Sequence, residues 1–393
     1  MQTEPSPRQR GEHPLIGISI AAILMRAPLT MLPPALGTIS AELALSAGVA
    51  GLTTTLPLLC FAVFAFVTPA LTRHGGPTRA MLLAMVAIFL GTLLRPAGQV
   101  WTLFVGIALV GIGIAVGNVL VPVVARAQAG RAGRSMSVYS TVMGLGAMAG
   151  SLVTGPLLEA GWGWQGVLLL MPPIALLGAI AWWVTMPPEP PTPGAEPAAP
   201  TWAAALRRPE TWLVTGMMGL QSIVFYSELT WMPSQLTEAG FSLTTASTAL
   251  ALFNGLGAIG SALLPRLLDG PRARAALVCS YALYAAGLLG MAAHAHGILC
   301  AAVVALGIAQ GAVFASALVA ISRSAPRELL PRVSAISQGI GYLLAAVGPT
   351  AVGVIGEAVG WRIPLIALAC SLTVSCACGL LALARTRTHP AVA

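Results

Sequence analysis

The sequence has no lysine among its 393 residues and a single aspartate, Asp269. A Walker A loop needs a lysine to reach the β- and γ-phosphates of ATP, and retinal is attached through a lysine Schiff base. ATP hydrolysis, retinal chemistry and an intramembrane pair of aspartates are therefore excluded for this chain. The H-E-x-x-H pattern of zinc proteases is missing as well. Little remains for catalysis, so we expect a protein that is not an enzyme and has no cofactor.

Charge is also scarce, since 8% of the residues are charged and 57% are hydrophobic, against roughly 25% charged in a soluble domain. Apolar runs of about 20 residues, long enough to cross a bilayer, recur along the chain. They predict an all-α integral membrane protein with twelve transmembrane helices. The expected helices are residues 15–36, 50–71, 79–97, 101–124, 136–158, 164–185, 211–234, 243–265, 275–293, 298–321, 333–356 and 361–384.

The basic residues, all of them arginines, predict how the chain is oriented. If the N-terminus is inside, seventeen of the twenty fall in inner loops and tails, as the positive-inside rule requires. The outer loops carry Glu42, Glu159, Glu238 and Glu357. Both termini are therefore expected in the cytoplasm. The net charge of +8 then reflects topology and contact with anionic lipid headgroups rather than binding of nucleic acid.

An internal repeat appears when the sequence is shifted by about 197 residues. The segment "GWQ" at 163–165 falls on "GWR" at 360–362, and Gly144 falls on Gly341. Two parallel repeats of six helices are the architecture of secondary transporters of the major facilitator type. We therefore expect the major facilitator fold, with two pseudo-symmetric six-helix bundles and a binding site near the midplane between them.

The joint between the two repeats is rich in proline. The segment "PPEPPTPGAEPAAP", residues 187–200, has seven prolines in fourteen residues and cannot pack a core. The predicted divisions are an N-terminal six-helix bundle at 1–186, a Pro-rich cytoplasmic linker at 187–208 and a C-terminal six-helix bundle at 209–393.

The six cysteines all lie in or beside apolar segments, where we expect them to act as small packing residues. Cys376 and Cys378 are the most closely spaced, but a helix turns residues two apart to different sides. No histidine or carboxylate accompanies them. We expect no metal site.

Only two ionisable side chains, Arg26 and Glu228, fall well inside predicted helices. A charge at the centre of a membrane helix costs at least about 2.5–3.5 kcal/mol and usually faces a water-filled cavity or a partner. The first and seventh helices carry these charges, and with the fourth and tenth they would line the central cavity. The polar and aromatic residues expected beside them are Thr30, Asn118, Tyr139, Gln221, Phe225, Gln310, Gln338 and Tyr342.

Each interior charge has more than one possible role. The guanidinium of Arg26 suits bidentate capture of a carboxylate or other small anion, and its alternatives are an ion pair with Glu228 or a cap on backbone carbonyls. For Glu228 three roles stay open: a protonatable group that couples transport to protons, a contact for a positive part of the substrate, and a structural or outer-gate partner.

Three segments resemble one known family. They are "RAPLTMLPPAL" (26–36), "GIGIAVGNVLVP" (111–122) and "GLQSIVFYSELTWMP" (219–233), and they are similar to the cyanate and 2-nitroimidazole transporters of the major facilitator superfamily. The resemblance runs over essentially the whole chain. It implies a bacterial inner-membrane protein that works by alternating access. The motif positions that it carries over are Arg26, Asn118, Gln221, Ser222 and Tyr226.

The resemblance also has departures. The conformational loop "ALTRHGGPTR" (70–79) keeps Arg73 and Arg79 but has Thr72 where the superfamily usually has an aspartate, while Asp269 occupies that slot in the second half. The family often shows Asn-x-Arg where this chain has Leu24-Met25-Arg26. Glu228 is not a recognised family position, which indicates that it serves this member's own substrate or coupling.

The leading hypothesis is secondary active transport of a small organic anion or zwitterion across the inner membrane, with Arg26 holding the negative group. Proton coupling is left open. One rival is proton-driven export of hydrophobic or nitroaromatic drugs. A rival of another class is a non-transporting membrane sensor or accessory subunit, against which no long tail or loop is available for signalling. We expect a monomer in the lipid bilayer whose partner is a small-molecule substrate.

Overall fold

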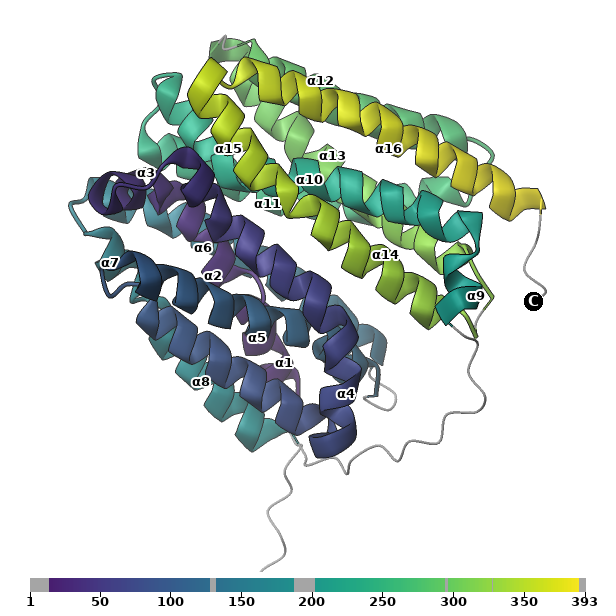
Figure 1. Cartoon of the computed structure of the whole chain (residues 1–393), viewed down its shortest axis with the longest axis horizontal. Helices are drawn as coiled ribbons and strands as arrows, with labels where there is room; N and C mark the ends of the chain where they lie inside the picture. Colours follow the sequence, from purple (N-terminus) through teal and green to yellow (C-terminus); the bar gives the residue numbers. More distant parts are fainter. Residues whose placement is uncertain (1–13, 128–131, 187–201, 294–295, 327, 389–393) are drawn as a thin grey trace, which may run out of the picture.

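The computed structural model describes residues 14–127, 132–186, 202–293, 296–326 and 328–388, and all of its regular elements are helices (Figure 1). The helices of the N-terminal half are α1 (Pro14–Leu24), α2 (Ala27–Thr30), α3 (Leu32–Leu43), α4 (Ala47–Leu94), α5 (Val100–Ala127), α6 (Ala132–Glu159), α7 (Trp164–Leu168) and α8 (Met171–Thr185). Those of the C-terminal half are α9 (Trp202–Leu206), α10 (Pro209–Glu238), α11 (Leu243–Leu268), α12 (Ala273–Ala292), α13 (His296–Arg323), α14 (Leu330–Ala345), α15 (Val347–Val359) and α16 (Arg362–Thr388). Residues 187–201 of the predicted linker lie outside the described residues.

The apolar helices are long enough to cross a membrane. Ten spans of the described residues meet this condition, and the bent pair Leu15–Thr30 and Leu32–Leu43 makes an eleventh. The seventh predicted helix corresponds to the 30-residue helix α10, which carries Gln221, Ser227 and Glu228 and is not among these apolar spans. The predicted all-α membrane fold is confirmed.

Several predicted helices are divided or joined in the structure. The first is broken twice, before α2 and before α3, and its two long parts meet at an angle of 40°. The helices expected at 50–71 and 79–97 both fall within α4 but are separate spans, because the backbone leaves helical geometry at Gly76. Gly76 has a φ of 77°, a left-handed conformation that glycine adopts without steric cost, so the tight turn between these two spans is made at that residue.

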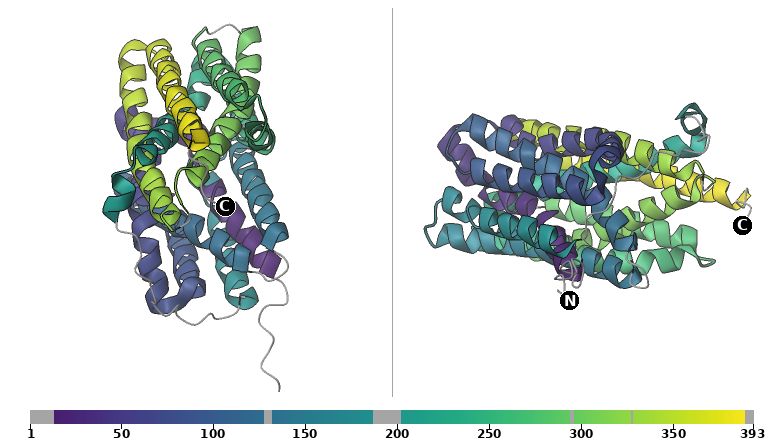
Figure 2. Two further views of the ribbon diagram at one scale, coloured as in Figure 1. Left: turned by 90° about the vertical axis from the view of Figure 1, so that its right-hand side faces the viewer. Right: turned by 90° about the horizontal axis from the view of Figure 1, so that it is seen from below.

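The two halves lie side by side in the bundle, one coloured purple to blue and the other teal to yellow (Figures 1 and 2). Contacts between the halves come from α6 against α11, from α4 against α14 and α15, and from α3 against α10. We call the end that contains Met186 and Trp202 the linker side, and the end that contains Glu42, Glu159, Glu238 and Glu357 the far side.

Glutamates at helix ends form hydrogen bonds on the far side, and the same pattern occurs in both halves. Within the N-terminal half, Glu42 accepts hydrogen bonds from Trp164 Nε1 and Gln165 Nε2, each at 2.7 Å. Within the C-terminal half, Glu238 accepts one from Trp361 Nε1, also at 2.7 Å. Each bond joins the end of the first predicted span of a half to the start of its last, so the repeat seen in the sequence is present in the hydrogen bonds.

A second pair of far-side glutamates joins the two halves. Glu159, at the end of α6, accepts hydrogen bonds from the backbone N–H of Thr244, at 3.1 Å, and from its hydroxyl. Glu357, near the end of α15, accepts one from the backbone N–H of Ala47 at 3.1 Å. A carboxylate is favourable at a helix N-terminus because the free N–H groups and the helix dipole attract it. These contacts hold the far side together.

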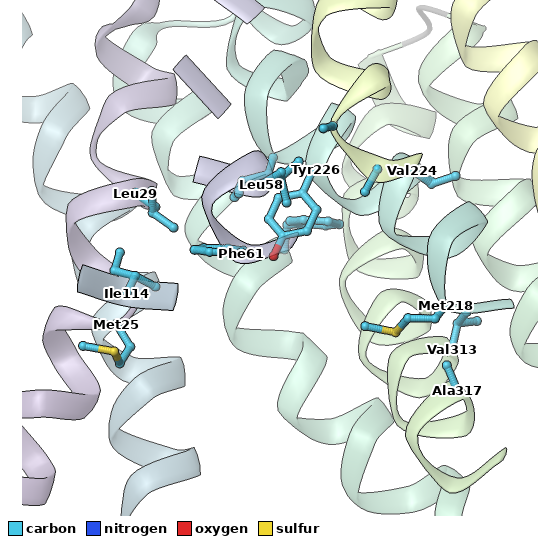
Figure 3. Close-up of a cluster of buried hydrophobic side chains, with 14 of the residues drawn as sticks. Met25, Leu29, Leu58, Phe61, Ile114, Met218, Val224, Tyr226, Val313 and Ala317 are labelled. Atoms are coloured by element: carbon cyan, nitrogen blue, oxygen red, sulfur yellow. The ribbon is translucent and has the colours of Figure 1, made fainter. Parts of the chain in front are cut away.

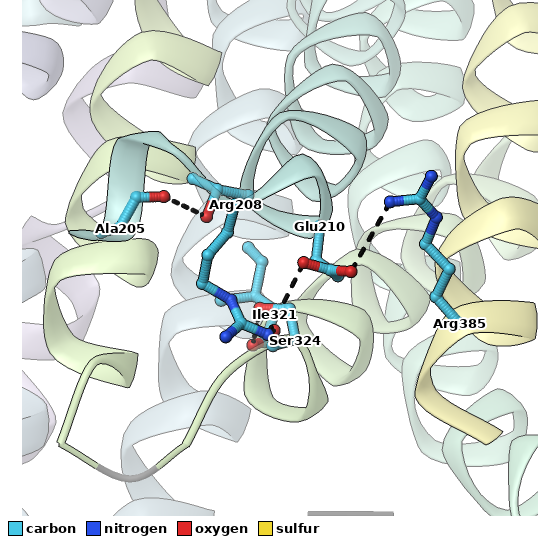
Figure 4. Close-up of polar contacts among 7 residues, drawn as sticks. Ala205, Arg208, Glu210, Ile321, Ser324 and Arg385 are labelled. Carbon is cyan, nitrogen blue, oxygen red and sulfur yellow. Dashed lines mark hydrogen bonds and ion pairs between the residues drawn. The ribbon is translucent and has the colours of Figure 1, made fainter. Parts of the chain in front are cut away.

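On the linker side, ion pairs connect helix ends of the C-terminal half. Glu210 lies between Arg208 and Arg385, at 3.6 Å from each (Figure 4). Asp269, at the end of α11, pairs with Arg323 at the end of α13. Of the predicted conformational loop in the first half, Arg79 is exposed, and the side chain of Arg73 lies outside the described part of the chain.

Candidate functional site

The helix that carries Arg26 is interrupted at that residue. Arg26 precedes α2 with φ −134° and ψ −46°, so it stands at a break and not inside a continuous helix as the hydrophobic run predicted. Pro28 follows closely and has no N–H, which leaves the carbonyl of Leu24 without its usual helical donor. The break sets Arg26 apart from the surrounding helix turns.

A second arginine, Arg95, supports the same break. It is 0% exposed, and its Nη1 donates a hydrogen bond of 2.6 Å to the carbonyl oxygen of Pro28. Sequence reasoning placed Arg95 at an outer helix end, where it does cap α4, but gave no sign that its side chain turns inward. The role of a cap on backbone carbonyls, considered for Arg26, is therefore filled by Arg95.

Aromatic rings surround the half-buried guanidinium of Arg26. Its Cζ lies 6.0 Å from the centroid of Phe225, within the range of a cation–π contact. Tyr226, Tyr342 and Tyr139 lie close enough to interact electrostatically with it. These residues come from both halves, so the structure brings together five residues that the sequence predicted for the site.

The rings also contact one another. Phe225 packs edge-on against Tyr226 with centroids 4.9 Å apart, and Tyr226 packs against Tyr342 at 6.3 Å. Phe61 of α4 adds an edge-on contact with Tyr342 at 5.6 Å. Figure 3 shows Tyr226 near Phe61, with the apolar side chains of both halves around them. Phe61 was missed by the sequence reading because an isolated phenylalanine in an apolar run gives no signal.

A cavity of about 250 Å³ opens between the halves beside this cluster. Asn118 of α5, Gln338 of α14 and Tyr342 line it together with Phe61, and it reaches Pro331 in the first turn of α14. It therefore extends toward the linker side. Asn118, Gln338 and Tyr342 were all predicted, and Tyr342 belongs both to this cavity and to the rings around Arg26.

The other predicted polar residues are buried and bonded within their own half. Gln221 Nε2 donates to Ser222 Oγ at 2.7 Å and to the Met218 carbonyl at 3.1 Å. Gln310 Nε2 donates to the Phe253 carbonyl at 3.2 Å, and Thr30 Oγ1 donates to the Ala27 carbonyl at 3.3 Å. These side chains stiffen the wall, and direct contact with a substrate stays a prediction for them.

Glu228 lies apart from Arg26. It is 0% exposed, and its surroundings include Gln235 of the same helix and Tyr284 of α12. Among the described residues Arg26 forms no ion pair with it. Spacings of four and three residues put Gln221, Phe225 and Glu228 on neighbouring turns of α10, yet Phe225 lies near the guanidinium while Glu228 lies near Gln235 and Tyr284.

Comparison with known protein families covers nearly the whole chain. Residues 18–276 and 270–393 match the family model described as Major Facilitator Superfamily. The chain belongs to this superfamily, and it is a multi-pass membrane transporter rather than an enzyme.

Named relatives cover nearly the full chain. It is 34% identical to "Uncharacterized transporter YycB" of Bacillus subtilis (strain 168), over 93% of this chain and 92% of that protein. It is 32% identical to the "2-nitroimidazole transporter" of Escherichia coli (strain K12), over 90% of this chain and 91% of that protein. It is 25% identical to "Cyanate transport protein CynX" of the same organism, over 87% and 89%. The predicted resemblance is confirmed.

A solved structure shows the same fold. The bacterial homologue of the human lysosomal transporter Spinster, in an inward-facing and unoccupied conformation, superposes with a TM-score of 0.80 at 17% identity, over 98% of this chain and 100% of that one. The major facilitator fold expected from the repeat is confirmed.

Proposed function

We propose that this protein moves a small organic anion or zwitterion across the membrane by alternating access, with Arg26 binding the negative group. The observation that carries the proposal is a half-buried guanidinium that stands at a helix break between the two halves, ringed by aromatic side chains and without a carboxylate partner among the described residues. A guanidinium offers five donors and keeps its charge. An anion bound there would gain charge-assisted hydrogen bonds in a site of low polarity.

The rings around Arg26 favour a flat cargo. Tyr342, Tyr226 and Phe61 present ring faces and edges beside the cavity, and stacked or edge-on contacts with a planar group add to the attraction of the guanidinium. Carboxylate, cyanate and nitro groups are all small and bear oxygen or nitrogen atoms with partial negative charge. Two relatives, a 2-nitroimidazole transporter and a cyanate transport protein, agree with this class.

The test uses purified protein in proteoliposomes with a panel of radiolabelled small carboxylates, cyanate and 2-nitroimidazole. We expect at least one anion to be transported, and Arg26→Lys to reduce its rate by about 100-fold, because lysine keeps the charge but loses the bidentate geometry. The control is Arg362→Lys, an exposed arginine on the far side. A normal rate for the Arg26→Lys protein would contradict the proposal.

A second function, export of neutral nitroaromatic or hydrophobic drugs, is favoured by the aromatic lining alone. It makes a different prediction, because a neutral cargo depends on the rings more than on the charge. Tyr342→Leu would then impair transport more than Arg26→Gln, and a drug-susceptibility screen in an efflux-deficient host would show protection. In either case we propose that the linker side is cytoplasmic, which the arginine distribution supports.

A further inference from the structure

Four buried polar side chains deep in the C-terminal half have no hydrogen-bond partner of ordinary geometry among the described residues. They are Ser227, Glu228 and Gln235 of α10 and Tyr284 of α12. Buried polar groups are nearly always paired, so each exception calls for an explanation. For Glu228 both carboxylate oxygens are unpaired, although an ionisable group inside the membrane normally has a partner.

No cation lies near Glu228. The nearby groups are the amide of Gln235, two turns along the same helix, and the hydroxyl of Tyr284. Arg26 faces the tyrosines of the central site instead. The charged residues of the described C-terminal helices otherwise stand near helix ends; they are Glu210, Glu238, Arg266, Arg274, Arg323, Arg332, Glu357, Arg362, Arg385 and Arg387.

These surroundings suit a neutral acid better than an anion. An ionised carboxylate removed from water without a cation or donors is very unfavourable. A protonated carboxyl group has one proton to donate and an oxygen to accept, and the Gln235 amide and the Tyr284 hydroxyl offer both kinds of partner. The cluster is therefore complementary to Glu228 with a proton bound.

Further hydroxyl groups lie between this cluster and the linker side. Tyr281 lies one turn before Tyr284 on α12, and its hydroxyl is 2.9 Å from Ser375 Oγ of α16. Ser375 Oγ in turn donates to the carbonyl of Met217 at 3.0 Å. The Ser316 hydroxyl of α13 interacts with Tyr281 from another side. Three helices therefore place hydroxyl groups at one level of the bundle.

A small cavity lies next to these hydroxyl groups. Ser316 and Met217 line it together with Arg323, which is at the linker-side end of α13. Its volume is about 10 Å³, on the order of what one water molecule needs. The cavity therefore has the Ser316 hydroxyl and the linker-side arginine Arg323 in its lining.

We propose that Glu228 is a proton-binding site, separate from the Arg26 site, which exchanges protons with the linker side through Tyr284, Tyr281 and Ser316. A proton delivered at the cavity is accepted by the Tyr281 hydroxyl, whose own proton passes toward Tyr284. The Tyr284 hydroxyl then gives its proton to a carboxylate oxygen of Glu228. Each hydroxyl keeps one proton, and ionised Glu228 becomes a neutral acid.

This inference deepens the proposed function, since a proton site inside one rocking half can couple proton movement to the cargo. Its test needs no cargo. The carbonyl stretch of a protonated carboxyl group is followed by infrared difference spectroscopy on the full protein in phosphatidylcholine vesicles. We expect a buried carboxyl band at neutral pH that is lost in Glu228→Gln and retained in Glu210→Gln.

The path is tested by the rate at which this band shifts after transfer to deuterated buffer. Tyr284→Phe and Tyr281→Phe keep the ring and remove one hydroxyl each, and we expect each to slow the exchange about tenfold, which is the effect of losing one good hydrogen bond. Ser371→Ala, one turn from Ser375 on α16, serves as the control with unchanged exchange. If one tyrosine variant fails to fold, the exchange rate of the other variant still tests the path, and the wild-type band still tests whether Glu228 holds a proton.

Two results would overturn the inference. A wild-type carboxyl band that Glu228→Gln leaves intact would show that Glu228 is ionised and holds no proton. An exchange rate that neither tyrosine variant changes would show that protons reach Glu228 by another route. The Arg26→Lys protein separates this inference from the proposed function, because loss of transport with an unchanged Glu228 band leaves the proton site standing.

Discussion

The N-terminal half has two interior arginines beside a broken helix, the half-buried Arg26 and the fully buried Arg95, whereas the C-terminal half buries a glutamate, Glu228, in the continuous helix α10. On the far side the halves are alike, since in each a glutamate at the end of the first predicted span accepts a hydrogen bond of 2.7 Å from a tryptophan at the start of the last. The repeat has therefore kept the bonds that hold each half in shape. It has diverged in the interior, where one half carries arginines and the other carries a glutamate.

The largest expected effect concerns the arginine that supports the broken helix. Arg95→Ala removes the hydrogen bond to the Pro28 carbonyl and leaves a cavity, so we expect the free energy of unfolding to fall by about 3 kcal/mol. Thermal unfolding in detergent measures it. Arg362→Ala, at an exposed position of the other half, should change stability by less than about 0.5 kcal/mol. Equal melting temperatures for the two variants would show that Arg95 does not hold the break.

The second prediction compares equivalent helix contacts. A Cβ on Gly311 of α13 would lie 1.9 Å from the carbonyl oxygen of Gly257, whereas one on Gly111 of α5 would lie 2.9 Å from Pro57 Cα. Backbone cannot move aside as easily as a side chain, and overpacking costs about 1–3 kcal/mol. We expect Gly311→Ala to destabilise more than Gly111→Ala.

The control for both is Gly144→Ala, where a Cβ would meet nothing within 4 Å. That variant should match or exceed the stability of the wild type, because alanine favours a helix by up to about 1 kcal/mol over glycine. A destabilised Gly144→Ala protein would show that the distance from an added Cβ to its nearest neighbour does not predict stability in this bundle.

The third prediction concerns the repeated glutamates. Glu42 accepts two hydrogen bonds and Glu238 one, so Glu42→Ala should lower the free energy of unfolding by about 1.5 kcal/mol and Glu238→Ala by about half of that. The melting temperatures of the two variants give the comparison. The reverse order would mean that the bond to Gln165 contributes nothing.

The smallest effect is expected where glutamates join the halves. Glu159→Gln weakens two contacts with Thr244, and Glu357→Gln weakens one with Ala47. Both should let the far side open more often. We expect maleimide labelling of an introduced Thr54→Cys, at a position that contacts Thr230 of the other half, to become about threefold faster. If the labelling of Thr54→Cys stays unchanged when Glu159→Gln and Glu357→Gln are combined, these contacts do not hold the far side closed.

Much of the fold could be predicted because the lengths of the apolar segments and the internal repeat can be read directly from the sequence. The membrane-spanning helices and the half-length period rest on such local signals, whereas Tyr226 was predicted for the site from the resemblance to the family. The break at Arg26 is harder to predict, because a proline such as Pro28 indicates a bend but does not say where the chain leaves the helix.

Two features of the site could not be predicted. Arg95 sits at a helix end, and nothing local tells whether such a side chain turns to water or inward to a carbonyl far away in the sequence. Glu228 shares a helix face with Gln221 in a wheel diagram, yet the direction of that face depends on how α10 is rotated against its neighbours. Both depend on tertiary contacts between segments far apart in the chain.

The position of the charged contacts has a consequence for the transport cycle. The carboxylates of Glu159 and Glu357 bridge the halves on the far side, while the ion pairs of Glu210 and Asp269 remain within one half on the linker side. Exposing the cargo toward the far side therefore requires the bonds of Glu159 and Glu357 to break. A change that weakens these bonds should shift the population of the transporter toward the conformation that is open on the far side.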